Sequence, residues 1–255
     1  MESCPTQAVL PLVGLAAEKV IRDRYNKTKR GSGTSRDGRG MMDKQLTDNP
    51  MRFAMLAVLF ELSLGGLAVI LGWLGGVWPW RTLVSLNRSA WIVGSMAGGA
   101  AAIVLFAGIV MVDRKPVGIF RQLQATVRRY VAPLFRNVNP GLLFVISLSA
   151  GVGEEFLFRG CCQAIVAGWI GSPWGDFGAL VVASALFGVC HWISKAYALV
   201  ASAMGFVLGG LFWATGSLLA PIVAHSLYDF LALLYLTRFP GMKKTAIRPE
   251  RHEPP

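Results

Sequence analysis

The sequence predicts an all-α membrane protein, a polytopic transmembrane helical bundle of about six spans, with six to eight as the full range. Three observations predict it. The 255-residue chain is 54% hydrophobic and 15% charged, with a mean hydropathy of +0.51, whereas soluble domains carry about 25% charged residues. Apolar runs of helical length recur along the chain. The basic residues gather in the tails and in one loop beside the apolar runs.

Six apolar runs form the predicted spans. They are Phe53–Gly75, Trp91–Val112, Pro140–Ile170, Phe177–Ile193, Ala196–Ala214 and Ser217–Leu236. We interpret the third as one long or kinked helix, because Glu154, Glu155 and Arg159 lie inside it without turn signals. Gly151 and Gly153 are the expected positions of a kink.

The distribution of lysine and arginine predicts the orientation. Six spans with both termini cytoplasmic place 22 basic residues inside and two outside, as the positive-inside rule requires. The basic, amphipathic stretch Val117–Phe135 is expected to lie on the cytoplasmic membrane surface, with an ordinary polar loop as the alternative. The net charge of +11 thus follows from topology, and we expect the lipid bilayer and no nucleic acid as a partner.

Ionisable side chains inside the predicted spans indicate a functional site, because each costs about 3 kcal/mol to insert. Glu155 and Arg159 lie only ~40° apart around a helix and are the natural ion pair, whereas Glu154 lies ~140° from Arg159. We therefore expect Glu154 to activate a water as a general base, and Glu155 and Arg159 to hold the shape of the site. The alternative is that both carboxylates only fasten helices together.

Two histidines on later spans complete the candidate site. His225 and Asp229 lie one helical turn apart, where the carboxylate would fix the tautomer of the imidazole, or would only form a helix-stabilising pair. His191 lies at the end of a span, where a lone histidine is more often structural. Glu154, His191 and His225 are also the candidate ligands of a zinc ion with a water in the fourth position, although no H-E-x-x-H motif is present.

The predicted boundaries place these three groups at different depths. At 1.5 Å per residue, Glu154 lies ~21 Å and His225 ~18 Å from the inner ends of their helices, whereas His191 lies only ~5 Å from the inner face. The groups of one site must meet. Either the boundary near Ser194 is therefore misplaced, or the helices tilt and break around a wet cavity.

Three motifs follow one another in the order E-E-x-x-x-R, F-x-x-x-H and H-x-x-x-D, at Glu154, Glu155, Arg159, Phe187, His191, His225 and Asp229. Together they resemble the motifs of the CPBP intramembrane proteases, the CAAX-protease and bacteriocin-processing family, which includes the type II CAAX prenyl endopeptidases. The resemblance covers about Pro140 to Leu236. It implies an intramembrane peptidase of eight or fewer helices with a cavity open toward the cytoplasm.

The resemblance also implies roles for the site residues. Glu154 and His191 would activate the attacking water, and His225 with residue 229 would form the oxyanion hole. The family includes asparagine at this last position, whereas this chain has Asp229. An ionised Asp229 would repel an oxyanion, so it is expected to be protonated, to orient His225 or to ligate a metal. The expected substrates are membrane-associated peptides or proteins, either prenylated at a CAAX-type C-terminus or without a lipid.

The chain accordingly divides into four predicted parts. These are a basic, disordered tail (1–50), two spans with the basic surface segment (51–139), a catalytic membrane domain (140–237) and a basic C-terminal tail (238–255). We expect a multi-pass integral membrane protein, in the plasma membrane or, in a bacterium, the inner membrane. Two other functions stay open, a non-catalytic scaffold or bacteriocin-immunity protein on the same fold and a small proton-coupled transporter. No inverted repeat relates the halves, which weakens the transporter.

Overall fold

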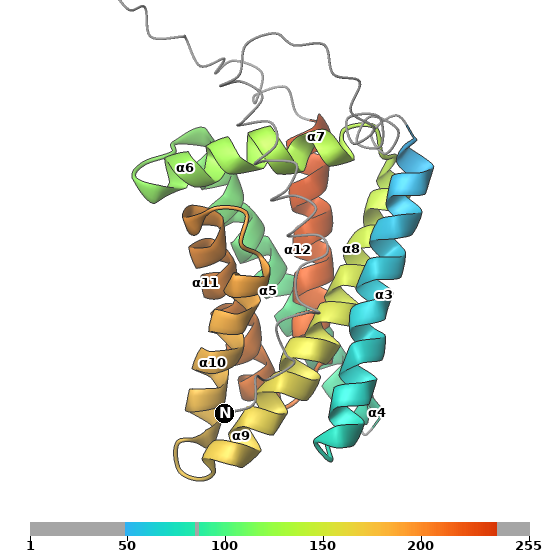
Figure 1. Ribbon diagram of the computed structural model, residues 1–255, viewed down its shortest axis with the longest axis vertical. Coiled ribbons are helices and arrows are strands. Elements are labelled where there is room, and N and C mark those ends of the chain that lie inside the picture. Colours follow the sequence, from blue (N-terminus) through green and yellow to red (C-terminus); the bar gives the residue numbers. More distant parts are fainter. Residues whose placement is uncertain (1–48, 85–86, 239–255) are drawn as a thin grey trace, which may run out of the picture.

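The computed structural model describes residues 49–84 and 87–238, which form a helical bundle without a strand in those ranges (Figure 1). In chain order the elements are α3 (Pro50–Leu74), α4 (Arg81–Val84), α5 (Arg88–Arg114), α6 (Ile119–Thr126), the π-helix η2 (Val127–Val131), α7 (Ala132–Phe135), α8 (Pro140–Glu155), the π-helix η3 (Phe156–Gln163), α9 (Ala164–Ile170), α10 (Gly175–Cys190), α11 (Lys195–Thr215) and α12 (Leu219–Arg238). The predicted tails, 1–50 and 238–255, lie outside these ranges except at their inner edges.

Five helical segments among the described residues are long and apolar enough to cross a membrane: α3, α5, the continuous Pro140–Ile170 segment, α11 and α12. Helix α10 is apolar as well, but it has only 16 residues. Large apolar side chains such as Leu59 of α3 and Val104 of α5 are exposed on the outside of the bundle, where a bilayer would cover them. The prediction of an all-α polytopic bundle is confirmed.

Short polar side chains begin the long helices. The Oδ1 atoms of Asn49, Asn87 and Asn139 each accept a hydrogen bond from a backbone amide in the first turn of α3, α5 and α8. Ser194 does the same for α11. Each cap satisfies an amide that has no partner inside its helix. At the other end of α11, Gly216 adopts the left-handed conformation with φ of 63°, which glycine adopts without strain.

Helix α8 is the centre of the packing, with α3 and α12 both lying against it. Helix α8 continues as an α-helix through Gly151 and Gly153, and the helix changes to a π-helix only at Phe156. The glycines permit close contact. A Cβ atom on Gly151 would overlap Ser226 of α12, and one on Gly153 would overlap the carbonyl oxygen of Glu61 in α3.

The amphipathic stretch predicted at Val117–Phe135 is helical, and α6, η2 and α7 lie across one end of the bundle (Figure 1). The start of α3 and the end of α12 reach the same end (Figure 1). Exposed basic residues of this segment include Arg121 and Arg129. Such an arrangement is typical of a cytoplasmic face, and the assignment of this end to the cytoplasm stays a prediction.

Candidate active site

The turn after α10 brings the side chain of His191 beside that of Glu154. The span predicted to end at Ile193 was wrong at its end, because α10 stops at Cys190 and His191 is its C-cap residue. The long segment that carries Glu154 also runs obliquely across the bundle (Figure 1). The conflict in depth therefore disappears, and Nε2 of His191 lies 3.7 Å from Oε2 of Glu154.

The backbone of α10 orients the His191 ring. Nδ1 of His191 lies 2.8 Å from the carbonyl oxygen of Phe187. A carbonyl oxygen only accepts hydrogen bonds, so Nδ1 carries the hydrogen and donates it. In the neutral ring, Nε2 is then a bare acceptor, and it is the nitrogen that faces Glu154. This tautomer is the one that a proton-accepting histidine needs.

The carboxylate of Glu154 is buried, and its Oε2 atom has no hydrogen-bond partner within the described ranges. The 3.7 Å that separates this oxygen from His191 exceeds the length of a direct hydrogen bond. A polar contact beyond 3.5 Å raises the question of a shared water, and a water beside the line that joins the two atoms can contact both of them. Glu154 and His191 together are therefore suited to bind one water and to accept a proton from it.

Glu155 and Arg159 form the expected ion pair in the bundle interior. Nη1 of Arg159 donates to Oε1 of Glu155 at 2.7 Å, and the two side chains are 1% and 0% exposed. Nη2 of Arg159 donates to the carbonyl oxygen of Gly205 in α11 at 3.0 Å. The arginine therefore links the centre of the Pro140–Ile170 segment to α11, and its charge is already engaged there.

His225 is held by a different carboxylate from the one predicted. Its Nδ1 lies 2.8 Å from Oε1 of Glu155 in α8, whereas its Nε2 lies 3.6 Å from Oδ2 of Asp229. The second distance allows an electrostatic interaction but exceeds a hydrogen bond. Glu155 therefore sets the orientation of His225, a role that sequence reasoning gave to Asp229. The i,i+4 spacing signalled Asp229, and no local spacing signals a contact between α8 and α12.

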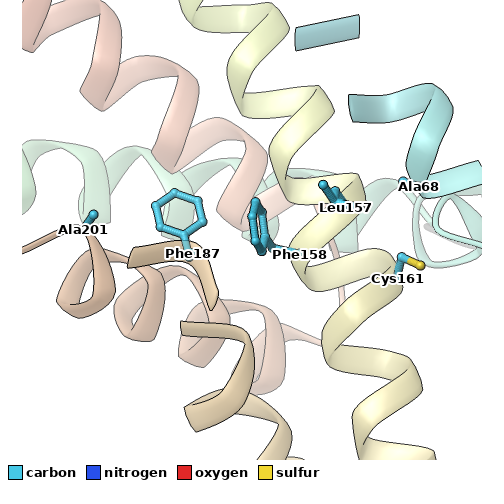
Figure 2. Close-up of a cluster of buried hydrophobic side chains, with 6 residues drawn as sticks. All are labelled: Ala68, Leu157, Phe158, Cys161, Phe187 and Ala201. Carbon is cyan, nitrogen blue, oxygen red and sulfur yellow. The ribbon is translucent and has the colours of Figure 1, made fainter. Parts of the chain in front are cut away.

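Phe187 joins these groups from the apolar side. Its ring stacks on His191 with centroids 4.4 Å apart, meets the edge of His225 at 5.9 Å, and lies 4.7 Å from the guanidinium carbon of Arg159. Figure 2 shows the Phe187 and Phe158 rings side by side in the apolar cluster that also contains Ala68, Leu157, Cys161 and Ala201. The phenylalanine of the F-x-x-x-H motif thus excludes water from one side of both histidines.

The side chains expected to hold zinc do not form a ligand set. Both ring nitrogens of His225 face carboxylates, and Nδ1 of His191 is bonded to the backbone. Within residues 49–84 and 87–238, no group of three His, Cys, Asp or Glu side chains is placed to hold a metal ion. This geometry does not fit a tetrahedral zinc site.

Sequence reasoning missed one acidic residue of the site. Glu61 lies inside the predicted span Phe53–Gly75, and the structure places its carboxylate where it interacts electrostatically with Glu154, His225 and Asp229. A single acidic residue in an apolar run is itself a signal of function, because its insertion into a membrane costs free energy. It was overlooked because Glu61 belongs to no motif.

Gly188 allows the His191 turn to pack closely on α11, so Gly188→Ala is expected to disturb the site. The added Cβ would overlap Oγ of Ser202 and lie 2.5 Å from the carbonyl oxygen of Ala198. Because backbone atoms cannot rotate away, we expect about 1–3 kcal/mol of destabilisation. The thermal unfolding midpoint of the detergent-purified variant measures it.

Gly210→Ala is the matched control, since it lies on α11 and its added Cβ has no atom within 4 Å. Alanine favours a helix over glycine by about 1 kcal/mol, so this control should unfold at or above the wild-type temperature. Equal midpoints for the two variants would contradict the close packing at Gly188.

A comparison with family models finds one match, of residues 136–231, to the family described as type II CAAX prenyl endopeptidase Rce1-like. The match confirms the resemblance drawn from the three motifs, and its range includes Glu154, His191 and His225 but not Glu61. Comparisons with curated proteins and with solved structures found no match. The apolar helices and this protease family together identify an integral, multi-pass membrane protein.

Proposed function

We propose, from the family match of residues 136–231, that the chain is an intramembrane endopeptidase that hydrolyses a peptide bond in membrane-associated substrates. The observation that carries this proposal is the pair formed by Glu154 and His191. A buried carboxylate oxygen without a partner lies 3.7 Å from an imidazole nitrogen. Burying ionisable groups together inside a membrane protein costs free energy. Where such groups occur, they usually form a functional site.

The proposed chemistry uses Glu154 as the general base. Glu154 takes one proton from the bound water, the water oxygen bonds to the carbonyl carbon of the substrate, and the proton is then given to the leaving amine as the C–N bond breaks. His191 orients the water. His225 stabilises the oxyanion that forms by donating from Nε2, while Nδ1 donates to Glu155, whose carboxylate complements the positive charge of the ring. Glu155 and Arg159 keep His225 in place.

Substrate would reach the site from the end of the bundle where α6 lies. The side chains of His191 and Asp229 are 28% and 31% exposed, whereas that of Glu154 is 9% exposed. Asp229 lies one turn after His225, toward the C-terminal end of α12. The turn that carries His191 is linked to α6 by a 2.9 Å hydrogen bond between the hydroxyls of Thr126 and Ser194. A membrane-anchored C-terminal segment, such as a prenylated CAAX sequence, is the class of substrate that the family match suggests.

The test is cleavage of a defined peptide panel by detergent-purified protein. The panel holds one CAAX-type sequence in farnesylated, geranylgeranylated and unlipidated forms, assayed with and without a chelator, beside the Glu154→Gln variant. We expect wild-type protein to release the C-terminal fragment of a lipidated peptide and the variant to release almost none. A wild-type protein that cleaves no form of the peptide would reject the proposal and favour a non-catalytic scaffold.

A further inference from the structure

We propose that Glu61 of α3 is a positioning residue of the active site, which donates a hydrogen bond to Glu154 and so holds that carboxylate ready to accept a proton. The inference rests on the proposed function and adds to the site a helix outside the matched segment 136–231.

Glu61 lies on the inward face of α3. Ala57 and Val58, one turn before it, pack on one buried cluster, and Leu64 and Ala68, one and two turns after it, pack on another. Residues three, four and seven positions apart share one face of a helix. Glu61 therefore points into the bundle, between two apolar clusters, and not toward lipid.

The backbone contact between α3 and α8 brings Glu61 beside Glu154. Gly153 precedes Glu154, and a Cβ there would overlap the carbonyl oxygen of Glu61. Since no side chain separates the two helices at this point, both glutamates extend into the same interior region. Their carboxylates interact electrostatically, and that of Glu61 also interacts with His225 and Asp229.

Both carboxylates have an oxygen that the rest of the site leaves unsatisfied. Oε2 of Glu61 and Oε2 of Glu154 are buried, and neither has a hydrogen-bond partner among the residues that the structure describes. The guanidinium of Arg159 is already bonded to Glu155 and to the carbonyl oxygen of Gly205. A buried polar oxygen without a partner costs free energy, so a hydrogen shared between these two carboxylates would satisfy both.

Two neighbouring carboxylates in a low-dielectric interior do not both ionise, because like charges repel strongly there. One keeps its hydrogen and donates it to the other. Glu154 faces His191 and the proposed water, so Glu154 is the partner that must be ionised for catalysis. Glu61 then keeps its hydrogen throughout turnover, and the proton taken from water passes through Glu154 alone.

The test compares Glu61→Gln with Glu61→Leu in the purified full-length protein, using a peptide that the wild type cleaves. Glutamine has nearly the same shape and donates from its amide, so kcat should stay within about threefold of wild type. Leucine has no donor, and since hydrogen bonds to charged groups are the strong ones, kcat should fall by about 10- to 100-fold with KM within about twofold. Where the leucine variant does not purify as a folded protein, Glu61→Ala removes the same donor.

Ser63→Leu is the matched control, because Ser63 lies two residues along α3 and its exposed hydroxyl bonds only to its own helix, at the carbonyl of Phe60. It should keep wild-type kcat. A leucine variant with wild-type kcat, or a glutamine variant as slow as the leucine variant, would overturn the role of Glu61. Glu154→Gln in the same assay separates the two proposals. If it is active, the proposed mechanism fails, and if it is inactive while every Glu61 variant is active, only the inference about Glu61 fails.

Discussion

Replacing Glu154 by glutamine is expected to lower kcat by about 100- to 10,000-fold, the usual contribution of a general base. Glutamine keeps the shape of the side chain but cannot take a proton from the water that we propose Glu154 activates. Because the substitution removes an interaction made only in the transition state, KM should change little. Steady-state cleavage of a lipidated peptide by the purified variant measures both constants.

Asp176→Asn is the control for this prediction. It also converts a carboxylate to an amide, but Asp176 is exposed in the first turn of α10, at the opposite end of that helix from His191. The control should keep wild-type kcat. A Glu154→Gln variant that also keeps it, with an unchanged unfolding midpoint, would show that Glu154 has only a packing role.

Replacing Arg159 by methionine is expected to destabilise the protein by about 3–5 kcal/mol, the usual cost of removing one partner of a buried ion pair. Methionine preserves most of the volume but leaves the Glu155 carboxylate, which is 0% exposed, without the guanidinium that pairs with it. It also removes the hydrogen bond to Gly205 in α11. Denaturant unfolding of the variant in detergent, followed by circular dichroism or tryptophan fluorescence, measures the loss.

The double variant Glu155→Gln/Arg159→Met supplies the comparison, because it removes the negative charge of Glu155 together with the positive charge of Arg159. If the pair is coupled as the 2.7 Å contact indicates, the double variant should be more stable than Arg159→Met alone. Its activity should remain low, since His225 loses the carboxylate that orients it. A double variant no more stable than Arg159→Met would contradict the coupling.

Much of this arrangement could be predicted from the sequence because helix geometry is local. The ion pair of Glu155 with Arg159 follows from a spacing of four residues, and the continuity of Pro140–Ile170 follows from the absence of turn residues. What could not be predicted depends on contacts between helices. The bond from His225 to Glu155 is of this kind, and so is the position of Glu61 against Gly153. No periodicity in one chain encodes the rotation of one helix against another.

The end of α10 could be predicted only approximately from the sequence. Trp192 and Ile193 continue the apolar run, so composition extends the helix, whereas the structure ends it at Cys190. The Phe187 carbonyl oxygen accepts the backbone amide of His191 at 3.2 Å and also accepts from Nδ1 of the same residue at 2.8 Å. Composition reports that a residue prefers an apolar environment, but it does not report whether the backbone there is helical.

The length of α10 has a consequence for the surrounding lipid. Sixteen residues rise only ~24 Å, whereas the hydrocarbon core of a bilayer is about 30 Å thick. A helix shorter than the bilayer is accommodated by responses that include local thinning, and we expect thinning here to bring headgroups and solvent closer to the His191 turn. The rate of peptide cleavage should therefore depend on bilayer thickness. Reconstitution in lipids of increasing acyl length should slow cleavage, because water then has a longer path to the site.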